Sequence, residues 1–329
     1  MPLDINMQLA GCSAKLRASK LSRLLSLKSV GDLFADTGKI DSYSNLRFTI
    51  DTILPITLDL GLFGKISLFH ALSDLIATGA YPKGICLSLG LGLSLTLEEA
   101  RILEQSIINT LKINNISLVN GHTYTCDNSS ITVCAIGELK REQSKILEDE
   151  TYYLILNKPI GGALSLAAGY LLNNEELIQS GRQLVSINPM AFTNLVSNLC
   201  VQGSTDISGF GLLGHIVTMA NCFKVSVQIN SSLIPINPYA IKAIEAMGPE
   251  CSSSRNMTDF NKYCDWRNNN IAQVYKYLYF ASETSGPILS IIHSSEIEFF
   301  ISKAQELGYP DTCLIGTLQK ATVPSVIIS

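Results

Sequence analysis

The stretch over residues 204–215, which reads STDISGFGLLGH, places the strongest local constraint on how this chain folds. Its three glycines allow a tight turn or a close approach of the backbone to a ligand, and the apolar residues that begin near Leu212 predict a helix after the turn. The free N–H groups at the start of such a helix favour an anion, and Asp206 could hold a cation that the anion shares. The pattern predicts a strand, a turn and a helix, and leaves open whether the turn is structural or binds a ligand.

Composition places the chain among globular proteins that bury a large core. With 329 residues, 47% hydrophobic and 16% charged, it has the length of about two domains. The formal net charge is −4 and the early basic residues are dispersed, which argues against a nucleic-acid partner. The most apolar runs contain Lys, Asp, Gly or Ser too often for a continuous span of about 20 residues, so we expect no membrane segment.

The N-terminus and the cysteines favour a cytoplasmic protein. Residues 1–14 contain Asp4 and lack a basic region followed by an apolar one, so they do not resemble a secretory signal. The nine cysteines are scattered, without a C-x-x-C pair or a Cys/His ligand spacing. This argues against a disulfide framework or a zinc site and fits a reducing compartment.

Hydrophobic periodicity predicts alternating strands and helices in the first half. The expected elements are a helix over 17–27, a strand over 46–50 that ends at Asp51, a helix over 63–77 capped by Gly79, a strand pattern from 85 to 97, and strands over 116–119 and 131–136 around a loop at 120–122. Thr96 and Glu99 have the spacing of a capping box at the start of a further helix.

The second half begins after a charged stretch, residues 138–150, which lacks apolar periodicity. We therefore expect one domain over 1–145 and another over 146–329. The expected elements of the second half are strands over 152–156, 225–229, 278–280 and 288–292, a helix over 296–307, and an irregular, flexible region over 251–270. Because strands and helices alternate in both halves, the fold class is α/β or α+β.

Several motifs resemble those of the selenophosphate synthetases (selenide, water dikinases), a family of the aminoimidazole ribonucleotide synthetase-like superfamily. The match runs nearly end to end. The motifs are Gly11-Cys12-Ser13-Ala14-Lys15, Asp36-Thr37-Gly38, Ile50-Asp51, Ala71-Leu72-Ser73-Asp74, Gly121-His122, Lys158-Pro159-Ile160-Gly161, residues 205–215, Arg255-Asn256 and Thr284-Ser285-Gly286.

The resemblance implies a two-domain fold in which an N-terminal sheet domain forms a barrel with its partner in a homodimer, followed by a C-terminal α/β domain. It implies synthesis of selenophosphate from ATP, selenide and water, with release of AMP and phosphate. Cleaving two phosphoanhydride bonds calls for Mg²⁺ across the polyphosphate, held by a few carboxylates.

The resemblance also implies roles for individual residues. The metal ligands would be Asp36, Asp51, Asp74 and Asp206, the first three also contacting the nucleotide together with Lys15, Gly121 and His122. The implied catalytic residues are Cys12, for the selenium nucleophile, and Lys15, on a mobile segment over 1–30 that closes over the site.

Alternatives remain open at several of these positions. Aspartates also cap helices and turns, and His122 and His215 have no metal triad around them in the sequence, which favours structural roles. The chain departs from the family pattern at Ala14, Ala35, His70, Asn120 and Thr125, where the family has Cys, Asp, Asn, Gly and Asp. A phosphotransfer enzyme of different specificity, or an ATP-binding protein without catalysis, is the alternative.

Overall fold

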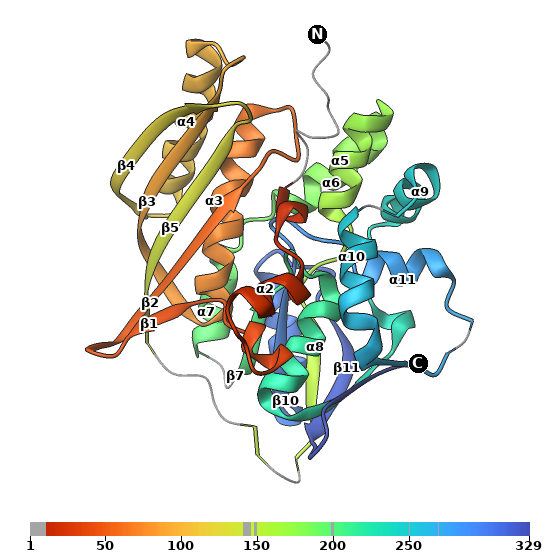
Figure 1. The fold of residues 1–329 in the computed structure, drawn as a ribbon. Helices are drawn as coiled ribbons and strands as arrows, with labels where there is room; N and C mark the ends of the chain where they lie inside the picture. The colour runs from red at the N-terminus through yellow and green to blue at the C-terminus, as the bar shows by residue number, and fades with distance from the viewer. Residues whose placement is uncertain (1–10, 141–145, 148–149, 199–200, 250, 269) are drawn as a thin grey trace.

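A long apolar helix, α3 (Leu60–Ala77), lies between two β-sheets in a mixed α/β fold (Figure 1). The computed structural model describes residues 11–140, 146–147, 150–198, 201–249, 251–268 and 270–329. Most of α3 is apolar on every side, and such a helix is stable only when it is buried all round. It begins where the Asp59 carboxylate accepts the Leu62 N–H, and it ends before Gly79, whose φ is +79°.

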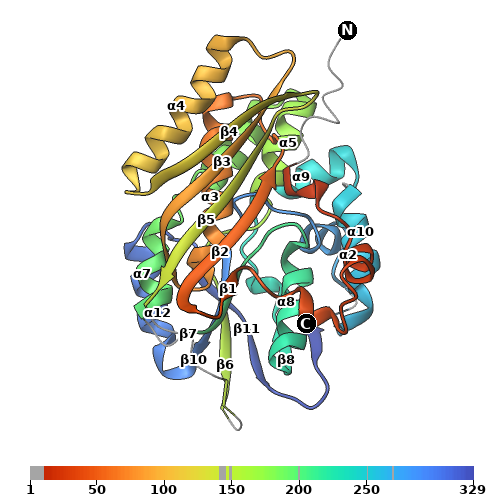
Figure 2. The same ribbon diagram turned by 60° about the vertical axis from the view of Figure 1, so that its left-hand side comes forward.

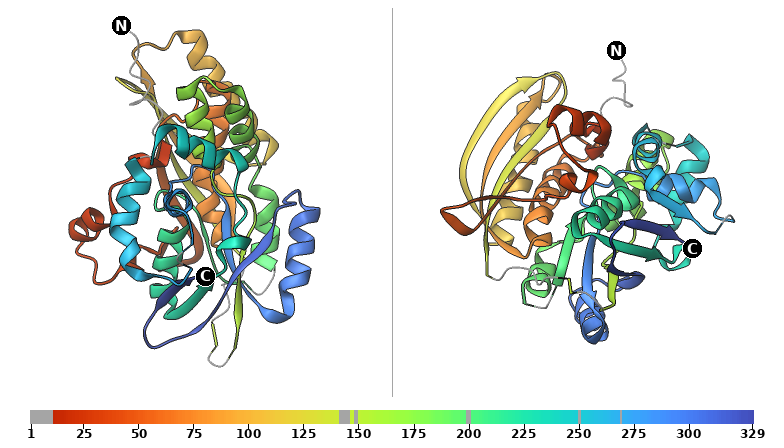
Figure 3. Two further views of the ribbon diagram at one scale, coloured as in Figure 1. Left: turned by 90° about the vertical axis from the view of Figure 1, so that its right-hand side faces the viewer. Right: turned by 60° about the horizontal axis from the view of Figure 1, so that its bottom comes forward.

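Among the helices of the described residues, only α3 is long and apolar enough to meet the criterion for a membrane span. Of that window, 78% is buried inside the fold, as in a helix of a protein core. The views from other sides show α3 enclosed between the first sheet and the second half of the chain (Figure 3).

The N-terminal sheet has five strands in the order β1-β2-β5-β3-β4 (Figure 2). Its strands are β1 (Gly38–Ile40), β2 (Tyr43–Ile53), β3 (Ala80–Gly92), β4 (Ser117–Cys126) and β5 (Ser130–Leu139). The pairing is antiparallel except between β3 and β4, which are parallel and joined through α4 (Leu97–Ile113). Residues alternate between the two faces, so Ile53 and Val133 are fully buried under α3 while Ile50 is 67% exposed.

The C-terminal sheet has seven strands in the order β7-β10-β6-β11-β8-β12-β9. Its strands are β6 (Tyr152–Leu156), β7 (Val201–Asp206), β8 (Val225–Ile229), β9 (Cys264–Trp266), β10 (Ile288–His293), β11 (Cys313–Lys320) and β12 (Ser325–Ile328). The helices of this half are α5 (Gly162–Leu172), α6 (Glu175–Val185), α7 (Met190–Asn198), α8 (Gly211–Phe223), α9 (Pro238–Met247), α10 (Cys251–Phe260), α11 (Gln273–Tyr279) and α12 (Ile297–Glu306).

The two halves share a hydrophobic core. Leu68 and Leu75 of α3 belong to the same buried cluster as Ile155 and Ile288 of the C-terminal sheet. In that cluster the ring of Phe192 packs edge-on against two further aromatic rings, at centroid distances of 5.7 and 5.2 Å. The predicted domain boundary after residue 145 falls at 141–145, outside the described residues, and stays a prediction, as does the mobility of residues 1–30.

The mixed α/β class and several predicted elements are confirmed. Strands β6 and β8 have the predicted bounds, and the Thr96 side chain accepts the Glu99 N–H while Glu99 accepts the Thr96 N–H, as a capping box requires. The strand–turn–helix over 204–215 is present as β7 and α8. The five-stranded sheet is open in the single chain, so the barrel stays a prediction about a dimer.

Three local predictions of strands and loops were wrong, and a fourth concerns α10. The strand predicted to end at Asp51 continues to Ile53, because Asp51 still pairs with Val133 on β5. The predicted loop at 120–122 is part of β4, where pairing with β3 satisfies the backbone despite a turn-prone Asn-Gly sequence. The predicted strand over 278–280 overlaps the last turn of α11, whose Leu278 and Tyr279 are buried.

The region predicted to be irregular, 251–270, contains α10. The buried side of that helix carries Ser252, Ser253 and Asn256, and its buried apolar residue, Phe260, is the last of the helix, so no hydrophobic period marks it in the sequence. Hydrogen bonds hold the buried side of α10 at Asn256. Its side-chain amide donates to the carbonyls of Gly209 and Phe280, both at 2.9 Å.

We expect Gly211→Ala to destabilise the fold far more than Gly248→Ala. Both glycines have a positive φ, +70° and +76°, a strain that costs a residue with a Cβ about 1–3 kcal/mol. At position 211 the added Cβ would also lie 2.6 Å from the Phe280 carbonyl carbon, whereas at 248 nothing lies within 4 Å. Urea unfolding of the two variants measures the difference, and equal losses would show that the turn before α8 is not held against Phe280.

Candidate functional site

Three aspartates from distant parts of the chain meet where the two halves join. Asp36 lies in the loop before β1, Asp74 is late in α3, and Asp206 is the last residue of β7. One carboxylate oxygen of each lies within 4.8 Å of the others. Asp206 is buried, and the other two are half-buried. The fold therefore brings together two carboxylates of the N-terminal half and one of the C-terminal half.

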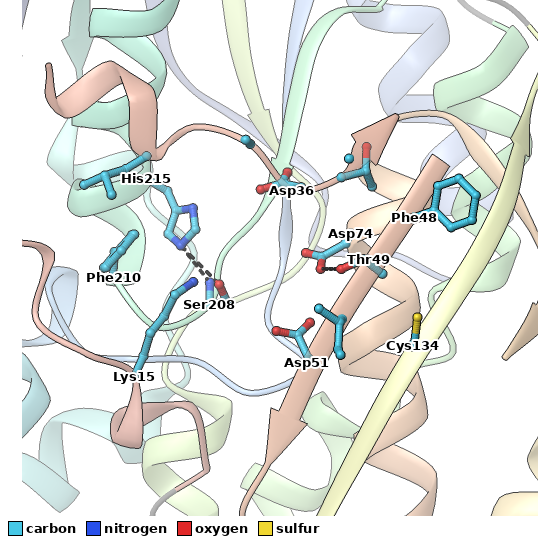
Figure 4. A pocket seen from close by; sticks show the side chains of 15 residues that line it. Lys15, Asp36, Phe48, Thr49, Asp51, Asp74, Cys134, Ser208, Phe210 and His215 are labelled. Atoms are coloured by element: carbon cyan, nitrogen blue, oxygen red, sulfur yellow. Dashed lines mark hydrogen bonds between the residues drawn. The ribbon is translucent and has the colours of Figure 1, made fainter. Parts of the chain in front are cut away.

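A cavity of about 630 Å³ opens beside this cluster (Figure 4). Asp51, on the α3 side of β2, lines it together with Asp36 and Asp74, and Lys15 enters it from the opposite wall. The Thr49 hydroxyl donates a hydrogen bond to Asp74 Oδ2 and fixes that side chain against the sheet. The structure thus places all four predicted metal-binding aspartates at the cavity or in the cluster beside it.

The aspartate cluster carries more negative charge than its surroundings offset. Burial and the neighbouring Asp206 raise the pKa of Asp36 and of Asp74 well above the usual value, and burial also raises the pKa of Asp206. Asp206 Oδ2 accepts a hydrogen bond from the Ser73 hydroxyl at 3.2 Å. Its Oδ1 is buried and has no hydrogen-bond partner among the described residues. A buried carboxylate oxygen in this state fits the coordination of a cation.

Lys15 supplies positive charge to the cavity. Its Nζ lies 4.6 Å from the centroid of the Phe210 ring. A Cβ at position 209 would lie 2.5 Å from Lys15 Cδ, so the glycine there makes room for the lysine stem. The charge of Lys15 lowers the pKa of Asp36 and of Asp206, opposing the effect of burial.

His215 orients Asp36 through a chain of hydrogen bonds. The Ser208 N–H donates to Nε2 at 3.2 Å, so Nδ1 carries the hydrogen and faces Thr205 Oγ1 at 3.3 Å. The Thr205 hydroxyl in turn donates to Asp36 Oδ1 at 3.2 Å. Burial, and next the charge of Lys15, lowers the pKa of His215 to about 3, so the ring is neutral in the folded protein.

Cys12 lies in a short turn, η1 (Gly11–Ala14), at the edge of the site. Its N–H donates to Thr284 Oγ1 at 3.1 Å, and its sulfur lies 2.8 Å from His70 Nε2. His70 precedes Asp74 by one turn of α3, so both lie on one face of that helix. The sulfur thus adjoins the aspartate cluster through His70, and it is not part of the cavity lining.

Gly121 and His122 lie elsewhere in the single chain. They are on the exposed edge strand β4, beside a separate cavity of about 250 Å³ that Cys86 and Cys134 also line. The His122 ring stacks on Tyr124 with centroids 6.2 Å apart. Within one chain the structure does not bring these two residues to the aspartate cluster, and their nucleotide contact stays a prediction.

Three buried polar residues near the site have no predicted role from the sequence: His70, Lys158 and Glu283. Lys158 Nζ donates to the carbonyls of Ser285 and Leu184 at 2.7 and 3.1 Å, and burial lowers its pKa to about 8. The Glu283 carboxylate accepts N–H groups at the start of α5. The sequence contained a signal for His70: it lies four residues before Asp74 on a predicted helix, a spacing that puts both side chains on one face.

Comparisons with known proteins identify the family of this chain. The family model described as AIR synthase related protein, N-terminal domain, matches residues 35–139. Selenide, water dikinase of Treponema denticola is 30% identical, covering 85% of this chain and 82% of its own length. The protein of that name from Porphyromonas gingivalis is 25% identical, covering 93% and 92%.

Solved structures of other proteins share the fold. Thiamine monophosphate kinase from Aquifex aeolicus superposes with a TM-score of 0.66 at 18% identity, over 94% of this chain and 95% of that one. HypE of E. coli, a hydrogenase maturation protein, gives 0.64 at 16% identity, over 91% and 85%. Fold and site together define an AIR synthase-like protein. Within that superfamily, the chain belongs to the selenide, water dikinase family, as the sequence motifs predicted.

His215 gives a testable dependence of stability on pH. The folded protein holds it neutral to a pKa of about 3, whereas in the unfolded chain it protonates near 6.5. Its contribution to stability is therefore complete above about pH 6.5 and is lost as the pH falls toward 3, by up to about 1.4 kcal/mol per pH unit. We expect the free energy of unfolding to fall more steeply between pH 7 and 5 in the wild type than in His215→Gln.

The aspartates change stability with pH in the direction opposite to His215. The wild type and His215→Gln are therefore compared with each other at each pH by urea unfolding. Gln keeps an acceptor for the Ser208 N–H and does not protonate. Parallel curves for the two proteins would contradict a neutral buried His215.

Proposed function

We propose that this protein is a selenophosphate synthetase that converts ATP, selenide and water into selenophosphate, AMP and phosphate. The observation that carries the proposal is the aspartate cluster with its unpartnered Asp206 Oδ1, in a chain of the selenide, water dikinase family. The relatives' names support an ATP-dependent kinase. Solved structures of two fold neighbours, described as complexed with AMPPCP and TMP and with ATP, support nucleotide binding in this fold.

The aspartate cluster fits Mg²⁺ by the chemistry of its donors. Mg²⁺ prefers carboxylate and water oxygens, and it commonly bridges one or two carboxylates to phosphate oxygens. Asp36, Asp74 and Asp206 would hold it, and Asp51 faces the same cavity. When bound, the ion neutralises charge on the polyphosphate and acts as a Lewis acid.

Lys15 and Cys12 would serve the transferred group and the nucleophile. Lys15 Nζ projects into the cavity, where a cation stabilises charge on a phosphoryl group. Cys12 holds a sulfur beside the cluster, and a soft thiolate suits the handling of selenide. The turn that carries Cys12 is tied to the C-terminal half through Thr284, so both halves position the nucleophile.

We further propose that the protein is a cytoplasmic homodimer that associates through the N-terminal sheet. The outer face of this sheet exposes apolar side chains that one chain leaves uncovered. Ile50 is 67% and Val119 65% exposed, and Tyr124 lies on the same strand as Val119. An exposed apolar patch of this kind marks an association surface.

Phosphorus NMR of a reaction with ATP, Mg²⁺ and anaerobic selenide tests the activity. We expect AMP, phosphate and a selenophosphate signal, all dependent on selenide. Because Cys12 is outside the cavity lining, Cys12→Ser should lose selenophosphate formation by at least about a hundredfold while ATP binding is retained. Production of ADP alone would favour a kinase of other specificity, and ATP binding without turnover would favour a non-catalytic protein.

Thermal unfolding with and without Mg²⁺ tests the metal ligands. Saturating Mg²⁺ should stabilise the wild type by about 2–3 kcal/mol at a hundred times its dissociation constant. Asp206→Asn should be more stable than the wild type without Mg²⁺, because it removes one charge from a repulsive cluster, and it should respond little to the ion. Asp41→Asn, an exposed carboxylate between β1 and β2, is the matched control and should respond as the wild type does. An equal Mg²⁺ response in Asp206→Asn would remove this residue from the site.

A further inference from the structure

Cys12 and His70 form a close pair that the family resemblance does not supply, because the family has asparagine where this chain has His70. Cys12 Sγ lies 2.8 Å from His70 Nε2, well within hydrogen-bonding range. His70 is only 3% exposed and Cys12 is half-buried. The contact joins positions 58 residues apart, so it exists only because the N-terminal turn docks on α3.

The hydrogen bond at the other ring nitrogen decides the direction of the contact. The Ser285 N–H donates to His70 Nδ1 at 3.2 Å, so Nδ1 presents its lone pair there. The hydrogen of the neutral ring is then on Nε2 and points at the cysteine sulfur. A doubly protonated ring would still present Nε2–H to the sulfur, but its Nδ1 would carry a hydrogen and could no longer accept the Ser285 N–H, so only the hydrogen bond to the sulfur is common to both charge states.

One loop holds both members of the pair. Thr284 Oγ1 accepts the Cys12 N–H at 3.1 Å, and the next residue, Ser285, fixes the imidazole. The loop is itself anchored, because Lys158 donates to the Ser285 carbonyl and the Glu283 carboxylate accepts N–H groups at the start of α5. Ser285 has a φ of +50°, a left-handed conformation that the surrounding contacts maintain.

We propose that His70 is a positioning residue that donates its Nε2–H to Cys12 Sγ, orients the sulfur beside the aspartate cluster and favours its thiolate form. The use of that sulfur on selenide rests on the proposed function, whereas the thiolate and its hydrogen bond do not. A thiolate, unlike a thiol, is the nucleophilic form of cysteine, and an adjacent histidine is a common means of stabilising it.

The charges around His70 agree with a hydrogen on Nε2. Burial lowers the pKa of His70, but the charge and hydrogen bond of Cys12, and then Asp51 and Asp206, more than offset burial and raise it to about 10. These groups come from the N-terminal turn, β2 and β7. The facing ring on α8, His215, is neutral.

Site-resolved alkylation with iodoacetamide tests the pair without reference to selenide. The thiolate sulfur forms a bond to carbon as iodide leaves, so the rate follows the thiolate fraction. An unassisted cysteine is only a few per cent thiolate at pH 7, while a stabilised thiolate is intrinsically less reactive, so His70→Ala should slow alkylation at Cys12 roughly three- to tenfold. The rate at Cys222, which is exposed on α8 and outside both the cavity lining and the proposed dimer face, should not change when followed by mass spectrometry in the same sample.

The pH profile separates this role from a purely structural one. Between pH 7 and 8.5 the Cys12 rate should rise less steeply in the wild type than in His70→Ala, which lacks the hydrogen-bond donor to the sulfur. His70→Gln, whose amide can donate to the sulfur, should restore part of the rate at pH 7. Unchanged rates and profiles in both variants would overturn the proposal.

A spectroscopic measurement keeps the proposal falsifiable if the His70 variants fail to fold. The ultraviolet difference spectrum of the native wild type minus Cys12→Ser at pH 7 should contain the thiolate band, and the band should vanish in denaturant. Its absence in the native protein would overturn the proposal. Absence of selenophosphate synthesis, with these alkylation results intact, would refute the proposed function and leave the thiolate pair standing.

Discussion

The burial of α3 between the two sheets is the interaction on which the site depends. Because this helix packs against the N-terminal sheet on one side and the β7 edge of the other sheet, Asp74 meets Asp206 across the junction. The same helix presents His70 one turn earlier. Carboxylates this close and this buried repel one another, so the apolar packing around α3 maintains an arrangement that is electrostatically unfavourable until a cation shares it.

The loop over 283–286 couples the remaining parts of the site. It contacts the Cys12 turn, the imidazole on α3, the buried Lys158 and the start of α5, so one short segment sets the relative positions of both halves. The glycine turn after β7 has a similar effect on the other wall, where Gly209 leaves space for Lys15. Displacement of either loop would alter the position of Cys12 and the shape of the cavity together.

Much of the fold could be predicted from local sequence, and the failures have physical causes. The Thr96 capping box and the helix after Asp206 carry their signals within a few residues. In α10 the buried side is mostly polar, with Asn256 bonded to the distant carbonyls of Gly209 and Phe280, so no hydrophobic period reveals it. The motifs indicated the aspartates, but the contact between Cys12 and His70 arises from tertiary packing, and no pattern along the chain encodes the distance between them.

The central claim is that the aspartate cluster binds a divalent cation together with the phosphates of ATP. A crystal structure of the protein with Mn²⁺ and a non-hydrolysable ATP analogue, with anomalous scattering used to locate the metal, tests it most directly. We predict an anomalous peak coordinated by Asp36, Asp74 and Asp206, with phosphate oxygens completing its shell in the cavity that Lys15 lines. A nucleotide bound in that cavity with no metal at these carboxylates, or a metal held elsewhere, would contradict the account.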